Sequence, residues 1–172
     1  VDLVRFVDAN DRLRFRGLQM YAGHLMHIGD FDERKNRSLD ALASLGEFRA
    51  TLRELGIECD VLTGGGTGTF DIDPAAGVLN ELQAGSYLFM DRQYNVVEGQ
   101  GSGGLPFATS LFVQTTVVSA NRAHLATTDA GLKAFATDDE APLLHDGSPS
   151  LQDGRDFFFG DEPGGVRWEG PE

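Results

Sequence analysis

Residues 57–69 read Ile-Glu-Cys-Asp-Val-Leu-Thr-Gly-Gly-Gly-Thr-Gly-Thr, an alternating apolar segment that runs directly into a glycine- and threonine-rich turn. Apolar side chains at every second position predict a short strand over Ile57 to Leu62. In the turn, Thr63 to Thr69, glycines allow positive φ and close approach of backbone N–H groups to an anion, and threonine hydroxyls add donors. The turn therefore indicates a phosphate-binding loop, and the alternative is a flexible glycine turn. It lacks the Gly-Lys-Ser/Thr ending of a Walker loop.

The clearest helix of the sequence precedes this strand. Large apolar residues recur there every three or four positions and form one stripe, at Leu39, Leu42, Leu45, Phe48, Leu52 and Leu55. Gly56 is a natural end for this helix. Before the helix, Leu13 to Tyr21 carries apolar residues on both faces, which indicates a strand covered on both sides, as in a parallel sheet.

Two further elements are predicted after the glycine-rich turn. Residues 74–82 predict a short helix opened by Pro74, and Ser86 to Met90 predicts a third strand. This alternation of strands and helices is typical of an α/β fold with right-handed parallel crossovers. A complete (β/α)8 barrel needs about 250 residues. We therefore interpret residues 1–95 as the closing portion of a barrel, entered by the last turns of a helix within residues 1–10.

The second part of the chain, residues 96–172, has a different composition. A glycine-rich linker, Gly99 to Gly104, opens it, and helical periodicity is absent. Segments rich in β-branched or aromatic residues predict strands at Leu111 to Ala120, Ala123 to Thr128 and Phe157 to Phe159. The sequence therefore predicts a second, mainly β domain.

Charge and composition exclude several classes of function. The formal net charge is -13, which repels phosphodiester backbones, and no basic stripe offsets it, so nucleic acid is not an expected partner. No apolar run approaches the roughly 20 residues that span a bilayer, and no signal peptide is visible. A lone cysteine, Cys59, suits a reducing compartment, so a cytoplasmic location is expected.

Two histidines follow the first predicted strand, in the segment Tyr21-Ala22-Gly23-His24-Leu25-Met26-His27. In barrels the active site occupies the rim at the carboxyl ends of the strands. Histidines three apart could share a metal, or one could move a proton. No third metal ligand is evident nearby, and the alternative is a pair of ordinary loop histidines.

Several segments, taken in order, resemble the D-threonine aldolase and D-serine dehydratase group of fold-type III pyridoxal-phosphate (PLP) enzymes. They are Leu13-Arg14-Phe15-Arg16-Gly17-Leu18-Gln19, the Tyr21-Ala22-Gly23-His24 segment, the glycine–threonine turn, Glu81-Leu82-Gln83-Ala84-Gly85-Ser86-Tyr87 with Phe89-Met90-Asp91, Asp129-Ala130-Gly131-Leu132-Lys133, and Phe159-Gly160-Asp161-Glu162. The likeness covers nearly the whole chain. It implies an alanine-racemase-like barrel followed by a β-domain, with PLP at the mouth of the barrel.

The resemblance also implies roles for particular residues. Gly65, Gly66 and Thr67 would hold the cofactor phosphate, helped by the backbone of Gly85 and Ser86. Tyr21 would line the cofactor pocket, and His27 would handle the proton of the substrate hydroxyl.

The implied reaction is cleavage of a D-β-hydroxy-α-amino acid, with D-threonine giving glycine and acetaldehyde. PLP acts in such reactions as an electron sink. The family also places a divalent metal (Mn, Mg or Zn) near the substrate hydroxyl. Related folds pair as dimers, so the resemblance allows a homodimer that acts on a small D-amino acid.

Three departures from the family pattern bear on catalysis. The imine-forming lysine of the family has no counterpart, because Lys35 opens the surface of the long helix and Lys133 falls in the β-domain. The metal-binding His-x-Asp or His-x-Cys pair is absent, and Pro163 replaces the histidine after Gly-Asp-Glu. We therefore expect the chain to be an incomplete part of an enzyme that does not catalyse by itself.

Two alternatives stay open. Within the same fold, the reaction could be D-serine dehydration, 3-hydroxyaspartate cleavage or amino-acid racemisation. From another class, the chain could be a non-catalytic remnant that binds a phosphate ligand.

Overall fold

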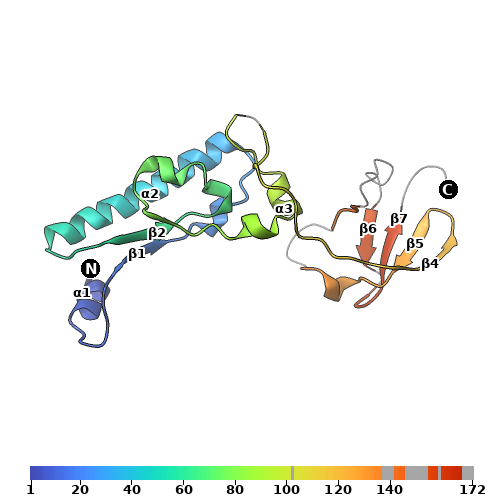
Figure 1. Ribbon diagram of the computed structural model, residues 1–172, viewed down its shortest axis with the longest axis horizontal. Helices are drawn as coiled ribbons and strands as arrows, with labels where there is room; N and C mark the ends of the chain where they lie inside the picture. Colours follow the sequence, from blue (N-terminus) through green and yellow to red (C-terminus); the bar gives the residue numbers. More distant parts are fainter. Residues whose placement is uncertain (102, 137–141, 146–154, 159, 168–172) are drawn as a thin grey trace. The chain divides into compact units, whose positions relative to one another are not determined.

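The computed structural model describes residues 1–101, 103–136, 142–145, 155–158 and 160–167. The chain forms two compact units, Val1–Ser110 and Leu111–Glu172, whose elements are labelled in Figure 1. The predicted domain limit at residues 95 and 96 lies within the first unit. Residues beyond it stay with this unit because Val97 is buried in a cluster with Leu25, Met26, Met90 and Tyr94, and Leu105 and Phe107 pack against that cluster.

The first unit is built on a three-stranded parallel sheet. Its strands are β1 (Gly17–Met20), β2 (Val61–Gly64) and β3 (Glu81–Leu82), hydrogen-bonded in that order. A short helix, α1 (Asp2–Asp8), precedes β1. The predicted α/β alternation with parallel strands is therefore confirmed for this unit, although each strand is shorter than predicted.

The long helix α2 (Phe31–Glu54) connects β1 to β2 and is shown beside them in Figure 1. It begins where the Asp30 carboxylate accepts a hydrogen bond from the backbone N–H of Glu33, 2.7 Å away. It ends before Gly56, which adopts a left-handed conformation with φ of 75°. The predicted end of the helix is therefore confirmed.

The buried face of α2 changes character along its length. Its C-terminal half buries Leu42, Leu45 and Leu52, as the periodicity predicts, and Leu45 packs with Cys59 and Leu62 beneath the sheet. Its N-terminal part instead buries two polar residues, Arg34 and Ser38. These polar residues lie at the end of the helix that faces the glycine–threonine turn, because Arg34 donates a hydrogen bond to Gly68.

The segment after the glycine-rich turn differs from the prediction. In place of a helix over residues 74–82, a single 3-10 turn, η3 (Asp73–Ala76), ends at Gly77 with φ of 66°, and β3 follows. The strand predicted over Ser86 to Met90 is wrong, because Ser86–Phe89 forms a second 3-10 turn, η4.

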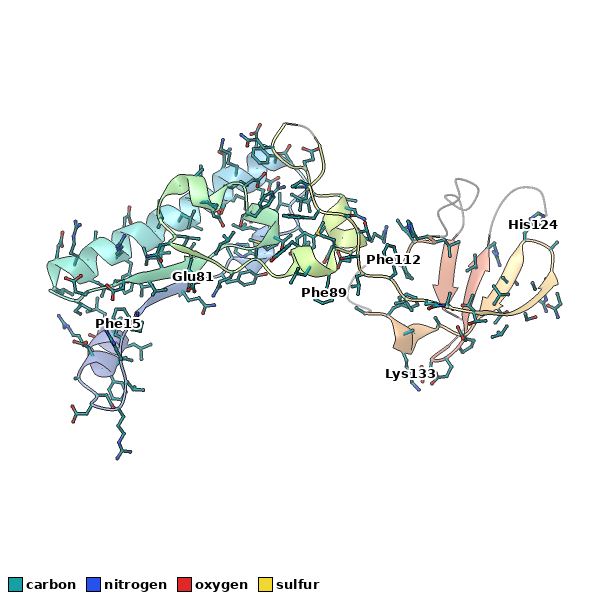
Figure 2. All side chains as sticks on the ribbon, viewed as in Figure 1. Phe15, Glu81, Phe89, Phe112, His124 and Lys133 are labelled. Carbon is teal, nitrogen blue, oxygen red and sulfur yellow. The ribbon has the colours of Figure 1, made fainter. Side chains whose placement is uncertain are left out.

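Asn80 explains this change. Its backbone N–H donates to Leu62 O, its side-chain oxygen accepts from Leu62 N, and its amide nitrogen donates to Asp60 O at 2.6 Å. These bonds align Glu81 and Leu82 with β2, so the pairing edge is occupied before residue 86 is reached. Ser86–Phe89 closes a local turn instead, and leaves the side chain of Phe89 exposed (Figure 2).

Four short elements complete the first unit around the sheet. They are η1 (Gly23–Leu25), which follows β1; η2 (Thr67–Thr69), which lies in the glycine–threonine turn; η4; and the helical turn α3 (Arg92–Asn95). Three of them follow the carboxyl end of a strand, so they form the rim of the sheet at that end.

The second unit is an antiparallel sheet with strand order β4-β5-β7-β6. The strands are β4 (Val117–Arg122), β5 (Leu125–Thr128), β6 (Arg155–Phe158) and β7 (Gly164–Arg167), and a 3-10 turn, η5 (Leu132–Ala134), follows β5. The three predicted β segments each contain part of a strand, although residues 111–116 form none and Phe159 lies outside the described residues. No helix within the described parts of either unit has the length and apolar character needed to cross a bilayer.

Candidate functional site

The carboxyl ends of the three parallel strands meet at one edge of the first unit. Met20 is in register with Gly64, and Gly64 is in register with Leu82. Parallel strands place the segments that follow them side by side. The structure therefore brings Tyr21, the glycine–threonine turn and the Gly85–Ser86 turn to one rim, as the sequence predicts.

Gly65 and Gly66 allow a close approach that any side chain would prevent. A Cβ atom on Gly66 would lie 2.6 Å from Met26 Sδ and 3.2 Å from Cε2 of Tyr21. Gly65 has a φ of 64°, and a Cβ there would lie 2.5 Å from a carboxylate oxygen of Asp73. The turn thus packs between the Tyr21 ring on one side and a buried carboxylate on the other.

Thr67 links the glycine–threonine turn to the next loop. It is almost fully buried, and its Oγ1 accepts a hydrogen bond from the backbone N–H of Tyr87 at 3.0 Å. Gly85 and Ser86 directly precede that N–H, so both predicted phosphate-binding segments are adjacent. The Thr67 hydroxyl can still donate its own hydrogen to an acceptor.

Asp73 anchors the turn from beneath, a role that sequence reasoning missed. Its two carboxylate oxygens accept hydrogen bonds from the hydroxyls of Ser38 and Thr69, each at 2.5 Å. Thr69 Oγ1 in turn accepts from the backbone N–H of Gly66 at 3.2 Å. Because this N–H is already bonded, Gly66 offers close packing rather than a free hydrogen-bond donor.

Arg34 holds three segments of the rim together and was also missed. Its guanidinium donates to the backbone oxygens of Gly68 at 2.7 Å, of Ile28 at 2.5 Å, and of Glu98. Burial lowers the pKa of Arg34, and the charges of Asp71, Glu98 and Asp30 oppose this effect. An arginine in the first turns of a helix normally indicates a solvated surface, so no sequence signal distinguished it.

His27 lies at the same rim, on the loop after η1. Its side chain is exposed, and its ring centroid is 4.4 Å from that of Tyr94, at an interplanar angle of 54°. Tyr94 is buried. Burial raises the pKa of Tyr94, the Ser86 side chain lowers it in part, and nearby Tyr21 adds to the increase.

The rim suits an anionic group but provides no lysine. Its polar groups are hydroxyls and backbone N–H groups, which are donors that favour phosphate oxygens. Lys35 lies on α2, with Nζ 5.9 Å from the ring of Phe31, and Lys133 in the second unit forms ion pairs with Asp161 and Glu162 (Figure 2). Both lysines thus have the positions that the sequence predicts for them, one on the helix and one in the β unit.

Metal ligands are not grouped at this rim. Within the described ranges, no cluster of three or more His, Cys, Asp or Glu side chains could hold a metal ion. His24 is exposed on η1. The family's divalent metal therefore has no ligand set among these residues.

Two of the segments that carry the family resemblance pack together in the second unit. The backbone N–H groups of Leu132 and Lys133 donate to the backbone oxygens of Gly160 and Asp161, at 3.1 and 3.0 Å. Lys133 Nζ lies 2.9 Å from a carboxylate oxygen of Glu162. The Asp129–Lys133 segment and the Gly160–Glu162 segment therefore form one local structure.

Solved structures define the class of the fold. An alanine-racemase-like protein from Idiomarina loihiensis aligns with 98% of the chain and 47% of its own length, with a TM-score of 0.65 at 17% identity. A D-threonine aldolase from Filomicrobium marinum aligns with 98% of the chain and 43% of its own length, with a TM-score of 0.84 at 37% identity. The chain thus has part of an alanine-racemase-like fold.

Sequence comparisons define the family. Residues 110–172 match the family described as "Putative serine dehydratase domain". A D-threonine aldolase from an Arthrobacter species is 41% identical over 157 residues, which are 91% of this chain and 40% of that protein. A 3-hydroxy-D-aspartate aldolase from Paracoccus denitrificans (strain Pd 1222) is 35% identical over 148 residues, 84% of this chain and 38% of that protein.

This chain belongs to the D-threonine aldolase and D-serine dehydratase-like family. It spans about two fifths of the length of the curated relatives that it matches.

Proposed function

We propose that this chain is part of a PLP-dependent lyase that cleaves D-β-hydroxy-α-amino acids, with D-threonine giving glycine and acetaldehyde. The observation that carries the proposal is the convergence of Tyr21, Thr67, Ser86 and His27 at the carboxyl rim of a parallel sheet. Relatives named as D-threonine and 3-hydroxy-D-aspartate aldolases support the reaction class.

The architecture proposed for the complete protein follows the same family. The first unit would form the closing part of an alanine-racemase-like (β/α)8 barrel, and the second would form part of a mainly β C-terminal domain. We keep residues 1–95 as the proposed barrel part and residues 96–172 as the proposed β-domain part, with residues 96–110 packed in the first unit. The open edges of β1 and β3 support this view, because parallel sheets are normally covered and extended by further strands.

In the proposed site, the cofactor phosphate lies against the glycine–threonine turn. Thr67 would donate its hydroxyl hydrogen, and the backbone of Gly65, Gly85 and Ser86 would complete the cradle. Gly66 would let the turn pack against Met26 and Tyr21, where a side chain would clash. PLP held there would supply an electron sink for the bond broken in the substrate.

Two side chains would act on the bound cofactor and substrate. The half-exposed ring of Tyr21, which flanks Gly66, would line the cofactor pocket. The exposed imidazole of His27 would accept the proton of the substrate β-hydroxyl, as a general base does when it lies within hydrogen-bond reach. Neither Lys35 nor Lys133 lies at the rim, so the chain by itself is not expected to catalyse.

The phosphate site is tested by measuring PLP retention in the complete protein. Thr67→Val removes the hydroxyl donor, and Gly66→Asp places a carboxylate against the phosphate, so both variants should release PLP more readily. Thr51→Val and Gly46→Asp, on α2 away from the rim, serve as matched controls. If the Thr67 and Gly66 variants hold the cofactor as the parent does, the proposed phosphate site is wrong.

Substrate specificity is tested with D-threonine, 3-hydroxy-D-aspartate, D-serine and D-alanine. Acetaldehyde from D-threonine supports the proposed reaction. Faster cleavage of 3-hydroxy-D-aspartate would favour the alternative that the Paracoccus relative suggests. Pyruvate from D-serine without acetaldehyde from D-threonine would favour a dehydratase. Binding of PLP without turnover of any of these substrates would favour a non-catalytic remnant of the family.

A further inference from the structure

Tyr94 occupies a position between the residues of the proposed site. It lies on α3, where the Asp91 carboxylate accepts a hydrogen bond from the Tyr94 backbone N–H at 3.1 Å. Its side chain is only 5% exposed and packs in the cluster with Leu25, Met26, Met90 and Val97. By burial alone it would be an ordinary core residue, for which phenylalanine would serve equally well.

Its ring, however, also contacts a residue of the proposed site. The centroid of the Tyr94 ring lies 4.4 Å from that of the His27 imidazole, at an interplanar angle of 54°. Tilted rings at this distance attract one another.

The contact also affects how freely the histidine moves. His27 is exposed, and an exposed side chain normally exchanges between rotamers. The rigid Tyr94 ring, fixed by the core and by α3, restricts the imidazole on one side.

We propose that Tyr94 is a positioning residue that fixes the His27 imidazole through its ring. The position of the imidazole follows from the contacts of this chain, whereas its effect on catalysis rests on the function proposed above. Tyr94 contacts neither the substrate nor the cofactor in this scheme.

The contacts are tested by NMR on the 172-residue chain, which needs no cofactor. Cross-relaxation between the ring protons of His27 and Tyr94 is expected, and its absence would overturn the proposal. In Tyr94→Leu the His27 ring protons should lose the ring-current displacement that Tyr94 causes. In Tyr94→Phe that displacement should persist, because phenylalanine keeps the ring.

Tyr87→Phe is the matched control. The Tyr87 side chain packs near Phe107, with ring centroids 5.6 Å apart, and its link to Thr67 uses the backbone. This variant should leave the His27 ring resonances unchanged. If Tyr94→Leu does not fold, Tyr94→Phe decides, because the absence of cross-relaxation between the ring protons of its new phenylalanine and those of His27 would contradict the proposed ring contact.

The complete enzyme provides a second readout that separates positioning from stability. Tyr94→Phe should retain most of the kcat of the parent, because phenylalanine keeps the ring that contacts His27. Tyr94→Leu should lower kcat about a hundredfold, because a displacement of about 1 Å can have that effect. Equal losses of kcat in both variants would overturn the positioning role. An inactive parent would contradict the proposed function and leave the NMR result standing.

Discussion

Asp129 accepts two hydrogen bonds at one carboxylate oxygen, from the backbone N–H of Thr116 at 2.8 Å and from the hydroxyl of Thr115 at 2.9 Å. These bonds, that of Thr116 first, hold the pKa of Asp129 below its ordinary value. A carboxylate with a lowered pKa in the folded state binds its proton less readily there than in the unfolded chain. It therefore stabilises the fold above its ordinary pKa, and this contribution is lost as the pH falls through the folded-state value.

We predict that the Thr116 amide becomes easier to exchange with solvent as the pH is lowered below about 4, the ordinary range of aspartate. Asp129→Asn should remove most of this additional pH dependence, because it keeps an acceptor oxygen but cannot be protonated. Thr115→Val should reduce it only in part, since the Thr116 bond remains. Amide exchange followed by NMR measures the effect, and an unchanged pH profile in Asp129→Asn would contradict the assignment.

Single residues of the rim show how much of the site the sequence could reveal. Tyr21 ends one predicted strand, and Thr67 and His27 follow predicted strands, so the local pattern indicated one edge for all three. Asp73, Arg34 and Tyr94 gave no such signal, because each makes its contacts with residues far away in the chain. Side chains of these types are common on turns and helix surfaces, and only folding brings their partners close.

At the scale of elements, α2 contains one glycine inside the helix and is followed by another at its end. A Cβ on Gly46 or on Gly56 would meet nothing within 4 Å. The two positions differ in backbone conformation, because Gly56 has a φ of 75° and Gly46 is helical. Alanine at these two positions therefore tests the effect of backbone conformation, because neither substitution causes a steric clash.

We predict opposite effects for alanine at these two glycines. Gly46→Ala should stabilise the first unit by about 1 kcal/mol, because alanine favours the helix. Gly56→Ala should destabilise it by about 1–2 kcal/mol, because a side chain disfavours the left-handed conformation. Urea unfolding monitored by helical circular dichroism measures both, and the same sign for both would contradict the role of Gly56.

The sequence predicted helix α2 well, because the pattern of a helix is local. It predicted the third strand poorly, because pairing with β2 decides where that strand forms. The periodicity and the glycine that define α2 lie within the helix itself, and both predictions are confirmed. Ser86 to Met90 has the composition of a strand, yet the strand forms at Glu81 and Leu82 because Asn80 bonds to β2. β-propensity indicates that a residue type suits a sheet. It does not specify which segment pairs with the edge strand.

At the scale of the whole molecule, charge is the dominant property. The formal net charge is -13, so the folded chain repels itself at low ionic strength. The Debye length falls from about 30 Å at 0.01 M salt to about 8 Å at 0.15 M. Screening should therefore relieve part of this repulsion.

We predict that the melting temperature rises between these two salt concentrations by about 2–4 °C, which corresponds to about 1 kcal/mol for a chain of this size. Sodium chloride and potassium chloride should act equally, because screening depends on ionic strength. A melting temperature that falls with salt, or that responds to only one of the two, would indicate specific ion pairs or ion binding instead.

The sequence by itself determined the α/β character of the first unit, the limits of its long helix, the β character of the second unit and the family. These properties depend on local patterns, such as the spacing of apolar residues in a helix or strand, or on motifs that occur in a fixed order along the chain. The tertiary structure alone decided which residues support the rim: the buried guanidinium of Arg34, the carboxylate of Asp73 and the ring of Tyr94 against His27. The physical reason is that strand register and burial, which act between distant segments, select these hydrogen-bond partners, whereas helix periodicity and turn conformation act between neighbours.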